Sequence, residues 1–153
     1  NLNAEVTFAA GNLKCRLIEG RYPNYNSVIP TDNPCQMTID RRALLGSVKR
    51  ILPFASESSQ SIRLRLGIGQ VEASSEDIDF ATSAKETIVC DYNGTPMSIG
   101  FKGPSLVEIL SSLTSDEVLM ELADPSRPCL IFPSEQPEGQ NILMLIMPML
   151  LND

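Results

Sequence analysis

The residue types that most often perform chemistry in proteins are thinly spread in this sequence. Histidine is absent, which removes the usual general base of Ser and Cys hydrolases and the commonest metal ligand. The cysteines form no CxxC pair, so their spacing indicates neither a zinc nor a redox site; they are Cys15, Cys35, Cys90 and Cys129. We interpret them as free thiols in a reducing compartment and expect a cytoplasmic protein.

The remaining catalytic possibility is a small α+β hydrolase or transferase that uses Cys90 or a pair of acids. The sequence offers no nucleophile motif and no phosphate loop for such chemistry. Gly67-Ile68-Gly69 is not a dinucleotide fingerprint, because no helical pattern follows it and the third glycine is missing. We therefore predict a protein that is not an enzyme and that holds no cofactor.

Length and composition are those of a globular chain with one medium domain and some residues left over. Of the 153 residues, 42% are hydrophobic but only 5% are aromatic, so the core must be aliphatic. The net charge of −7 argues against a general nucleic-acid binder, although it does not exclude a protein that confines its bases to one face. No signal region is evident at the N-terminus, and no apolar run approaches the roughly 18 residues of a membrane span.

The elements that must position any site begin with a hairpin. Residues 4–18 alternate, with Val6 and Phe8 on one face and a turn at Gly11-Asn12. Two strands are not stable alone in water, so they either pack on the following domain or are the last strands of a preceding domain.

The rest of the chain predicts two helices and a series of strands. Asp40 can cap a helix that runs to about Pro53, and a second helix begins near Pro104. Strands are expected at residues 35–39, 62–66, 71–74, 78–84, 86–92, 97–101, 118–122, 128–132 and 142–147, with a hairpin turn at Asn93-Gly94. One strand-helix-strands unit thus occurs twice, at about 35–84 and 86–148, without sequence identity between the halves. Two helices on one side of antiparallel sheet is an α+β layer arrangement.

Two stretches stand out from this pattern. Residues 16–30 read RLIEGRYPNYNSVIP, in which Pro23 and Pro30 keep the chain extended. We interpret this stretch as the end of one domain and a linker into the next, the alternative being an ordinary strand and surface loop. Near the C-terminus, Met147-Pro148-Met149 follows an apolar run at 142–146.

These two motifs resemble those of the bacterial sliding clamp, the beta subunit of DNA polymerase III. The linker signature of that family is a polar turn with Gly, then Arg, aromatic, Pro, polar and Tyr, closing in aliphatic-Pro; here these are residues 19–25 and 29–30. The resemblance implies a sliding-clamp fold, in which paired helices line the hole of a ring. It also implies that residues 1–30 are the last strands of the middle domain and a linker, and that 31–153 are the third domain.

The same resemblance implies a processivity factor of the replicative DNA polymerase. The intact protein would be a head-to-tail homodimeric ring around duplex DNA, with no membrane partner. Polymerase, clamp loader and repair proteins would dock through a motif of Gln followed by a Leu-Phe type pair. The alternative is a generic peptide-binding module unrelated to replication, which would have the same groove but no basic helix face.

The best candidate site is an apolar groove. Walls of Leu, Met and Pro suit an extended peptide with apolar anchors, and Pro148 ends the last strand because it cannot donate a further ladder hydrogen bond. The alternative is a C-terminal strand buried in the core. The predicted groove residues are Pro23, Val28, Leu145, Ile146, Met147, Pro148 and Met149; the resemblance adds Ser27, where family members often carry Arg, and Ser126, Pro128 and Ser59 near the pocket.

Two further surfaces follow from the resemblance. A basic helix face would attract phosphates without reading sequence, unless it is an ordinary solvated face; its residues are Arg42, Lys49, Arg50 and Lys102. An assembly edge would meet another subunit, unless its acids form a solvated loop; its residues are Ile51, Leu52, Pro53, Phe54, Glu76, Asp77 and Asp79. These acids lack the Gly and distal Glu of a calcium loop, so we expect no metal site.

Overall fold

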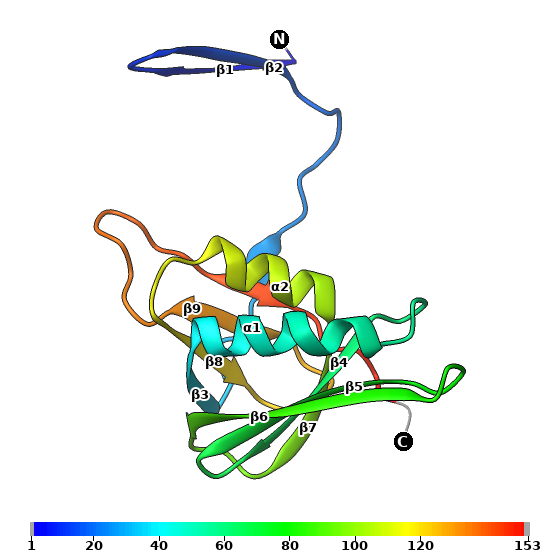
Figure 1. The fold of residues 1–153 in the computed structure, drawn as a ribbon. Helices are drawn as coiled ribbons and strands as arrows, with labels where there is room; N and C mark the ends of the chain where they lie inside the picture. The colour runs from blue at the N-terminus through cyan, green and yellow to red at the C-terminus, as the bar shows by residue number, and fades with distance from the viewer. Residues whose placement is uncertain (1, 152–153) are drawn as a thin grey trace.

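The computed structural model describes residues 2–151; Asn1, Asn152 and Asp153, which fall within the predicted domain limits, lie outside the described part. A two-stranded sheet of β1 (Asn3–Phe8) and β2 (Gly11–Arg16) precedes a larger antiparallel sheet of eight strands. The strand order of the larger sheet is β10-β9-β8-β3-β6-β5-β4-β7. Two helices lie side by side on one face of it (Figure 1), which confirms the α+β prediction.

The larger sheet and its helices consist of two units with one element order, which confirms the predicted duplication, but residues 86–92 belong to the first unit and not, as predicted, to the second. The first unit contains β3 (Cys35–Asp40), α1 (Arg41–Ile51), the 3-10 turn η2 (Leu52–Phe54), β4 (Ser61–Gly67), β5 (Gln70–Asp77) and β6 (Thr82–Tyr92). The second unit contains β7 (Met97–Lys102), α2 (Gly103–Ser112), β8 (Glu117–Leu122), β9 (Cys129–Pro133) and β10 (Met144–Ile146).

The core lies between the helices and the sheet and is almost entirely aliphatic. The α1 helix begins where predicted, because the Asp40 carboxylate accepts a hydrogen bond from the Ala43 amide at 2.7 Å. Each helix buries one side against the sheet. The fully buried side chains there include Leu44 and Val48 of α1 and Leu106 of α2. Each fully buried aliphatic side chain of this kind contributes roughly 1.5–3 kcal/mol.

A buried guanidinium joins the two helices. Arg41 at the start of α1 donates from Nε to the Ser115 carbonyl at 2.6 Å and from Nη1 to the Leu110 carbonyl at 3.0 Å. These are carbonyls at and just beyond the C-terminal end of α2, where unsatisfied acceptors and the helix dipole both favour a cation. The sequence did not single out Arg41.

The predicted hairpin at Asn93-Gly94 is wrong. β6 and β7 are not neighbours, because β7 pairs with β4 at the far edge of the sheet. Asn93 instead continues the pairing with β3: its amide donates to the Gln36 carbonyl at 3.1 Å, and its Oδ1 accepts from the Gln36 amide at 2.7 Å. Gly94 is a glycine for a packing reason, since a side chain there would collide with Tyr92 and Cys35.

Two other turns lie elsewhere than predicted. The first hairpin turns at Ala9-Ala10, and Gly11 pairs with Phe8 within the sheet. The strands predicted at 78–84 and 86–92 are instead one continuous strand, Thr82–Tyr92. Residues 78–81 form the turn before it, in which the Asp77 carboxylate accepts hydrogen bonds from the amides of residues 79 and 80.

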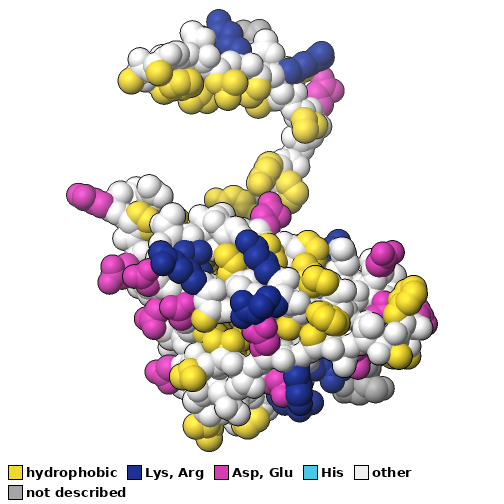
Figure 2. Space-filling view, in the orientation of Figure 1, with side chains coloured by type: hydrophobic (Ala, Val, Ile, Leu, Met, Phe, Trp, Pro, Cys, Tyr) yellow, Lys and Arg dark blue, Asp and Glu magenta, His cyan; other side chains and the backbone are white. Residues whose placement is uncertain are grey.

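The hairpin β1–β2 has one apolar and one polar face. Val6 lies opposite Leu13, and both are exposed on the face that also carries Phe8. Figure 2 shows hydrophobic side chains gathered along this face of the hairpin. On the polar face, Lys14 forms an ion pair with Glu5 at 3.2 Å. Val6, Phe8 and Leu13 are each more than half exposed, so no other described part of the chain covers this apolar face.

Candidate functional site

The C-terminal tail, residues 147–151, leaves the sheet at the end of β10. Ile146 is 6% exposed and belongs to the core, whereas Met147 is 56% exposed. The predicted groove residue Ile146 therefore supports the surface from below and does not line it. Pro148 has no amide hydrogen, and the next amide, that of Met149, donates to the Gly100 carbonyl of β7 at 2.8 Å.

The linker forms a short exposed path. Tyr25–Ser27 is a 3-10 turn, η1, in which the Ser27 hydroxyl donates to the Asn24 carbonyl at 2.7 Å. Val28 ends this turn and is 58% exposed, and Pro23 before it is exposed as well. Apolar side chains of the linker are thus available at the surface, as the groove prediction requires.

The end of the linker is tied to the loop between β8 and β9. Asp32 forms an ion pair with Arg127, and this guanidinium holds the pKa of the Asp32 carboxyl below its ordinary value by hydrogen bonding and charge. Asn33 Nδ2 donates to the carbonyls of Pro128 and Glu121, both at 3.0 Å. Because Cys129, next to Pro128, pairs with Ile146, the residues just after the linker and the start of the tail lie at the same end of β9. No spacing in the sequence indicates these long-range pairs.

Other predicted groove residues have local roles. Ser126 donates from both its amide and its hydroxyl to Asp124 Oδ1, and these bonds lower the pKa of Asp124. Leu145 and Pro148 are half-buried. The described residues thus bring Pro128 and the start of the tail to one end of the molecule, and the complete groove remains a prediction.

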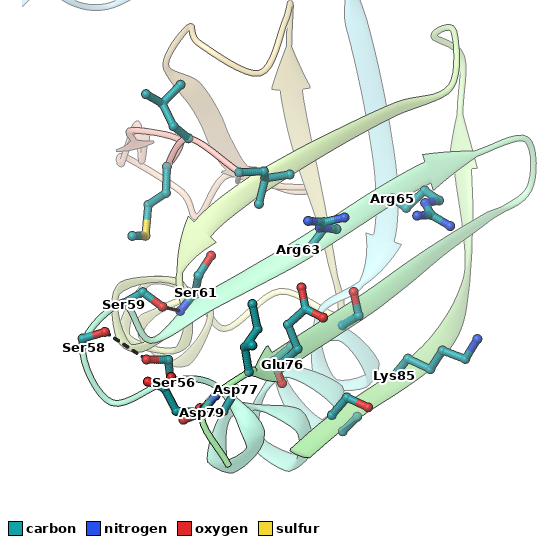
Figure 3. A pocket seen from close by; sticks show the side chains of 18 residues that line it. Ser56, Ser58, Ser59, Ser61, Arg63, Arg65, Glu76, Asp77, Asp79 and Lys85 are labelled. Atoms are coloured by element: carbon teal, nitrogen blue, oxygen red, sulfur yellow. Dashed lines mark hydrogen bonds between the residues drawn. The ribbon is translucent and has the colours of Figure 1, made fainter. Parts of the chain in front are cut away.

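A cavity of about 630 Å³ lies on the outer face of β4, β5 and β6, beside the tail (Figure 3). Of the predicted groove it includes Met149 and Ser59 only. Its lining holds three bases and three acids: Arg63, Arg65 and Lys85 from β4 and β6, and Glu76, Asp77 and Asp79 from β5 and the turn after it. Such balanced charge does not select a cation or an anion.

Bases gather on the helix face of the molecule, over α1 (Figure 2). Arg50 is not free, since its guanidinium makes two bonds of 2.7 Å to the Glu86 carboxylate, and this hydrogen bonding lowers the pKa of Glu86. Arg42 lies 3.9 Å from Asp116, at the limit of an ion pair. Lys49 is exposed and has no such carboxylate among residues 2–151. Lys102 precedes α2 without a capping bond from its side chain.

The predicted assembly edge divides into buried and exposed residues. Ile51 is 1% exposed and faces the core, so its side chain is not available to a partner; Asp77 is also buried and fixes its own turn. Pro53, Phe54, Glu76 and Asp79 are exposed, and Leu52 is half-buried.

The resemblance also implies that an outer strand takes part in this assembly edge, and a strand with one unpaired side lies near these residues. β5 pairs with β6 from Thr82 to Val89, whereas β3 pairs only with the end of β6, from Cys90 to Tyr92. Within the described range no strand pairs with the other side of residues 82–89. An unpaired edge of this length is a template for another strand.

Comparison with known proteins gives consistent matches. A family model for the DNA polymerase III beta subunit, C-terminal domain, matches residues 26–150. The beta sliding clamp of Caulobacter vibrioides is 29% identical over 137 residues, covering 90% of this chain and 37% of that protein. The beta sliding clamp of Pseudomonas putida is 28% identical over 147 residues, covering 96% and 38%.

Solved structures agree in fold. The sliding clamp of Caulobacter crescentus matches with a TM-score of 0.87 at 26% identity, covering 98% of this chain and 39% of that chain. The sliding clamp of Pseudomonas aeruginosa gives a TM-score of 0.88 at 23% identity, over 97% and 40%, which shows the fold alone.

Two helices on one face of a twice-repeated antiparallel sheet define the chain as a DNA-clamp domain. It belongs to the family of the DNA polymerase III beta subunit, C-terminal domain, a non-catalytic family of DNA replication. The chain spans 37% to 38% of the length of the two curated relatives. In the described part, no helix has the length and apolarity needed to cross a membrane, and no group of acids, cysteines or histidines is arranged to hold a metal ion.

Proposed function

We propose that this chain is part of a bacterial sliding clamp that encircles duplex DNA and gives the replicative polymerase its processivity. The family match over residues 26–150 carries the proposal. Residues 1–30 would then be the last strands of a middle domain and the linker, and 31–153 the third domain. The unpartnered apolar face of the hairpin supports this division, because exposed faces of that kind are costly unless something covers them.

Partner proteins would dock on a pocket formed by the linker and the tail. Two exposed apolar side chains, Val28 and Met147, support this proposal, and the ties from Asn33 to the β8–β9 loop keep the linker and the tail at one end of β9. The ligand would be an extended peptide with apolar anchors, of the type Gln-x-x-Leu-Phe. We call this surface the partner pocket.

DNA would lie against the helix face and another subunit against the free edge of β6. Lys49, with no partner carboxylate in the described range, supports a loose phosphate contact without base readout. The unpaired side of residues 82–89, beside exposed Phe54 and Glu76, supports a head-to-tail ring.

A topological experiment tests the function. The full-length protein is loaded on nicked circular DNA with its clamp loader, and its retention is measured by gel filtration before and after the circle is linearised. A clamp stays on the circle and is released from the linear ends. Equal retention on both forms would contradict encirclement.

A binding experiment tests the pocket in the same protein. Fluorescence anisotropy of a labelled Gln-x-x-Leu-Phe peptide should show saturable binding that Met147→Ala weakens by about tenfold, since one lost apolar anchor removes roughly 1.4 kcal/mol or more. Leu150→Ala is the matched control, because Leu150 is an equally apolar residue of the tail, 87% exposed, that lines the cavity instead. Equal losses in both variants would contradict the assignment.

A further inference from the structure

Among residues 2–151, one backbone bridge joins the tail to the rest of the molecule. Gly100 and Met149 form a single antiparallel bridge, with the Met149 amide donating to the Gly100 carbonyl at 2.8 Å. Pro148 can make no such bond, so the bridge is the first backbone attachment after the end of β10. Met147 and Pro148 therefore lie between two fixed points, the end of β10 at Ile146 and the bridge at Met149.

Gly100 is a glycine because the tail lies against it. Its φ is not positive, so the backbone of β7 does not require glycine there, and glycine in a strand interior normally weakens the strand. A Cβ at this position would lie 2.9 Å from the Met149 carbonyl oxygen and 2.7 Å from Leu151 Cδ2. Any side chain at residue 100 must displace the tail backbone.

The other side of the tail is open. Met149, Leu150 and Leu151 line the cavity of about 630 Å³ on the outer face of the sheet (Figure 3). A tail pushed away from Gly100 thus has space to move into and need not disturb the core.

We infer that Gly100 is a positioning residue for the partner pocket. Its missing side chain lets Met149 seat on β7, and this seating sets the direction in which Met147 and Pro148 face a bound peptide. Gly100 itself contributes no side chain to the pocket. This inference rests on the proposed peptide-binding function.

The test compares Gly100→Ala with Gly67→Ala in the full-length protein. Gly67 lies in the neighbouring strand β4, and a Cβ there would meet only the Gln70 carbonyl oxygen, at an ordinary 3.7 Å. We expect Gly100→Ala to weaken peptide binding about tenfold and Gly67→Ala to leave it unchanged, with both melting temperatures within about 3 °C of the parent.

Methyl NMR of labelled methionines separates seating from general damage. Met147 and Met149 report on the tail, and Met37 and Met120, both fully buried, report on the core. In Gly100→Ala we expect the tail methyls to shift and the core methyls to stay. Shifted tail methyls with unchanged affinity would overturn the inference and leave the pocket intact.

A second measurement needs no variant. If seating and peptide binding are coupled, saturating peptide must slow hydrogen exchange of the Met149 amide by a comparable factor, about tenfold. Unchanged exchange at Met149 on binding would overturn the inference. Absence of peptide binding by the parent protein would overturn both the pocket and this role, and it is recognised without any Gly100 variant.

Discussion

The two units share one element order but are closed differently. In the first unit, β3 pairs with the end of β6 in a ladder that includes Met37 and Tyr92, both buried. In the second unit, the equivalent strands β7 and β10 do not pair, and in the described part of the chain a single bridge joins Gly100 of β7 to Met149, three residues after β10. We call the contact between the first and last strands of a unit its seam: the first seam lies in the core, and the second lies at the edge of the core. One of two duplicated units can therefore lose the pairing of its last strand while the other keeps it.

The helices of the two units differ in the same sense. α1 has a capping carboxylate at Asp40 and carries bases, among them Lys49 and Arg50. α2 follows Lys102, has no side-chain cap, and contains Glu108 as its only charged residue. The first helix is thus better supported locally, and the proposed phosphate contacts belong mainly to it.

The largest effect should come from breaking the first seam. Met37→Ala removes a side chain with no exposed surface and should lower the free energy of unfolding by about 2–5 kcal/mol. Met149→Ala, at the half-buried second seam, should cost less than about 1 kcal/mol. Urea denaturation followed by circular dichroism measures both. Similar costs at the two seams would contradict the comparison.

Removing the cap of α1 and adding one to α2 should test whether capping makes α1 the more stable helix. Asp40→Ala should cost about 1 kcal/mol, because the Ala43 amide loses its acceptor. Lys102→Asp should stabilise the protein by about 0.5–1 kcal/mol, because it supplies an acceptor and removes a cation from a helix N-terminus. The same unfolding experiment applies, and a loss of stability in Lys102→Asp would show that α2 is not limited by its cap.

Within α1, the two adjacent bases should differ in DNA retention. Lys49→Ala in the full-length ring should reduce the slope of log affinity against log salt by about 1 unit. Arg50→Ala should reduce it less, because Glu86 already compensates that charge. Arg65→Ala on the outer face of the sheet is the matched control and should have no effect, because it lies outside both the helix face and the proposed subunit edge. Retention measured across a salt series tests this order. A larger change of slope in Arg50→Ala than in Lys49→Ala would contradict it.

The smallest effect concerns pH. Hydrogen bonding from Arg50 holds the pKa of Glu86 below its ordinary value, so the pair stabilises the fold above the unfolded pKa of about 4.3 and stops doing so as pH falls through the folded pKa. The difference in melting temperature between the parent and Glu86→Gln should be constant near neutral pH and shrink below about pH 4.3. Because Arg50 is exposed and Glu86 is only half-buried, solvent screens the pair and the change should be small. A difference independent of pH would contradict the role of this pair.

The element order, the Asp40 cap and the half-buried strand Ser61–Gly67 were predictable because each depends on local periodicity or a local capping bond. The predicted hairpin at Asn93-Gly94 is wrong because a turn signal depends only on neighbouring residues. The end of β6 pairs instead with β3, which lies far from it in the sequence. In the same way, Asp77 was read as a surface acid because its buried turn depends on folded geometry.

The candidate surfaces were predictable only in part. Pro148 marked the end of the last strand and so the exposure of Met147. The pairing of Arg50 with Glu86 joins residues from different elements, and no sequence spacing indicates it. Gly100 did carry a usable signal, since glycine inside a strand often marks the close approach of another backbone.

The hairpin places a chemical reporter at the proposed domain boundary. Cys15 pairs with Ala4 on the apolar face and is exposed, whereas Cys129 is buried and its thiol pKa is raised by desolvation. Thiolate and access both govern alkylation, so a maleimide dye should label Cys15 first in this chain and leave Cys129 unmodified until unfolding. If a preceding domain covers the apolar face of the hairpin, as proposed, the labelling rate of Cys15 measures how often that face is exposed to solvent.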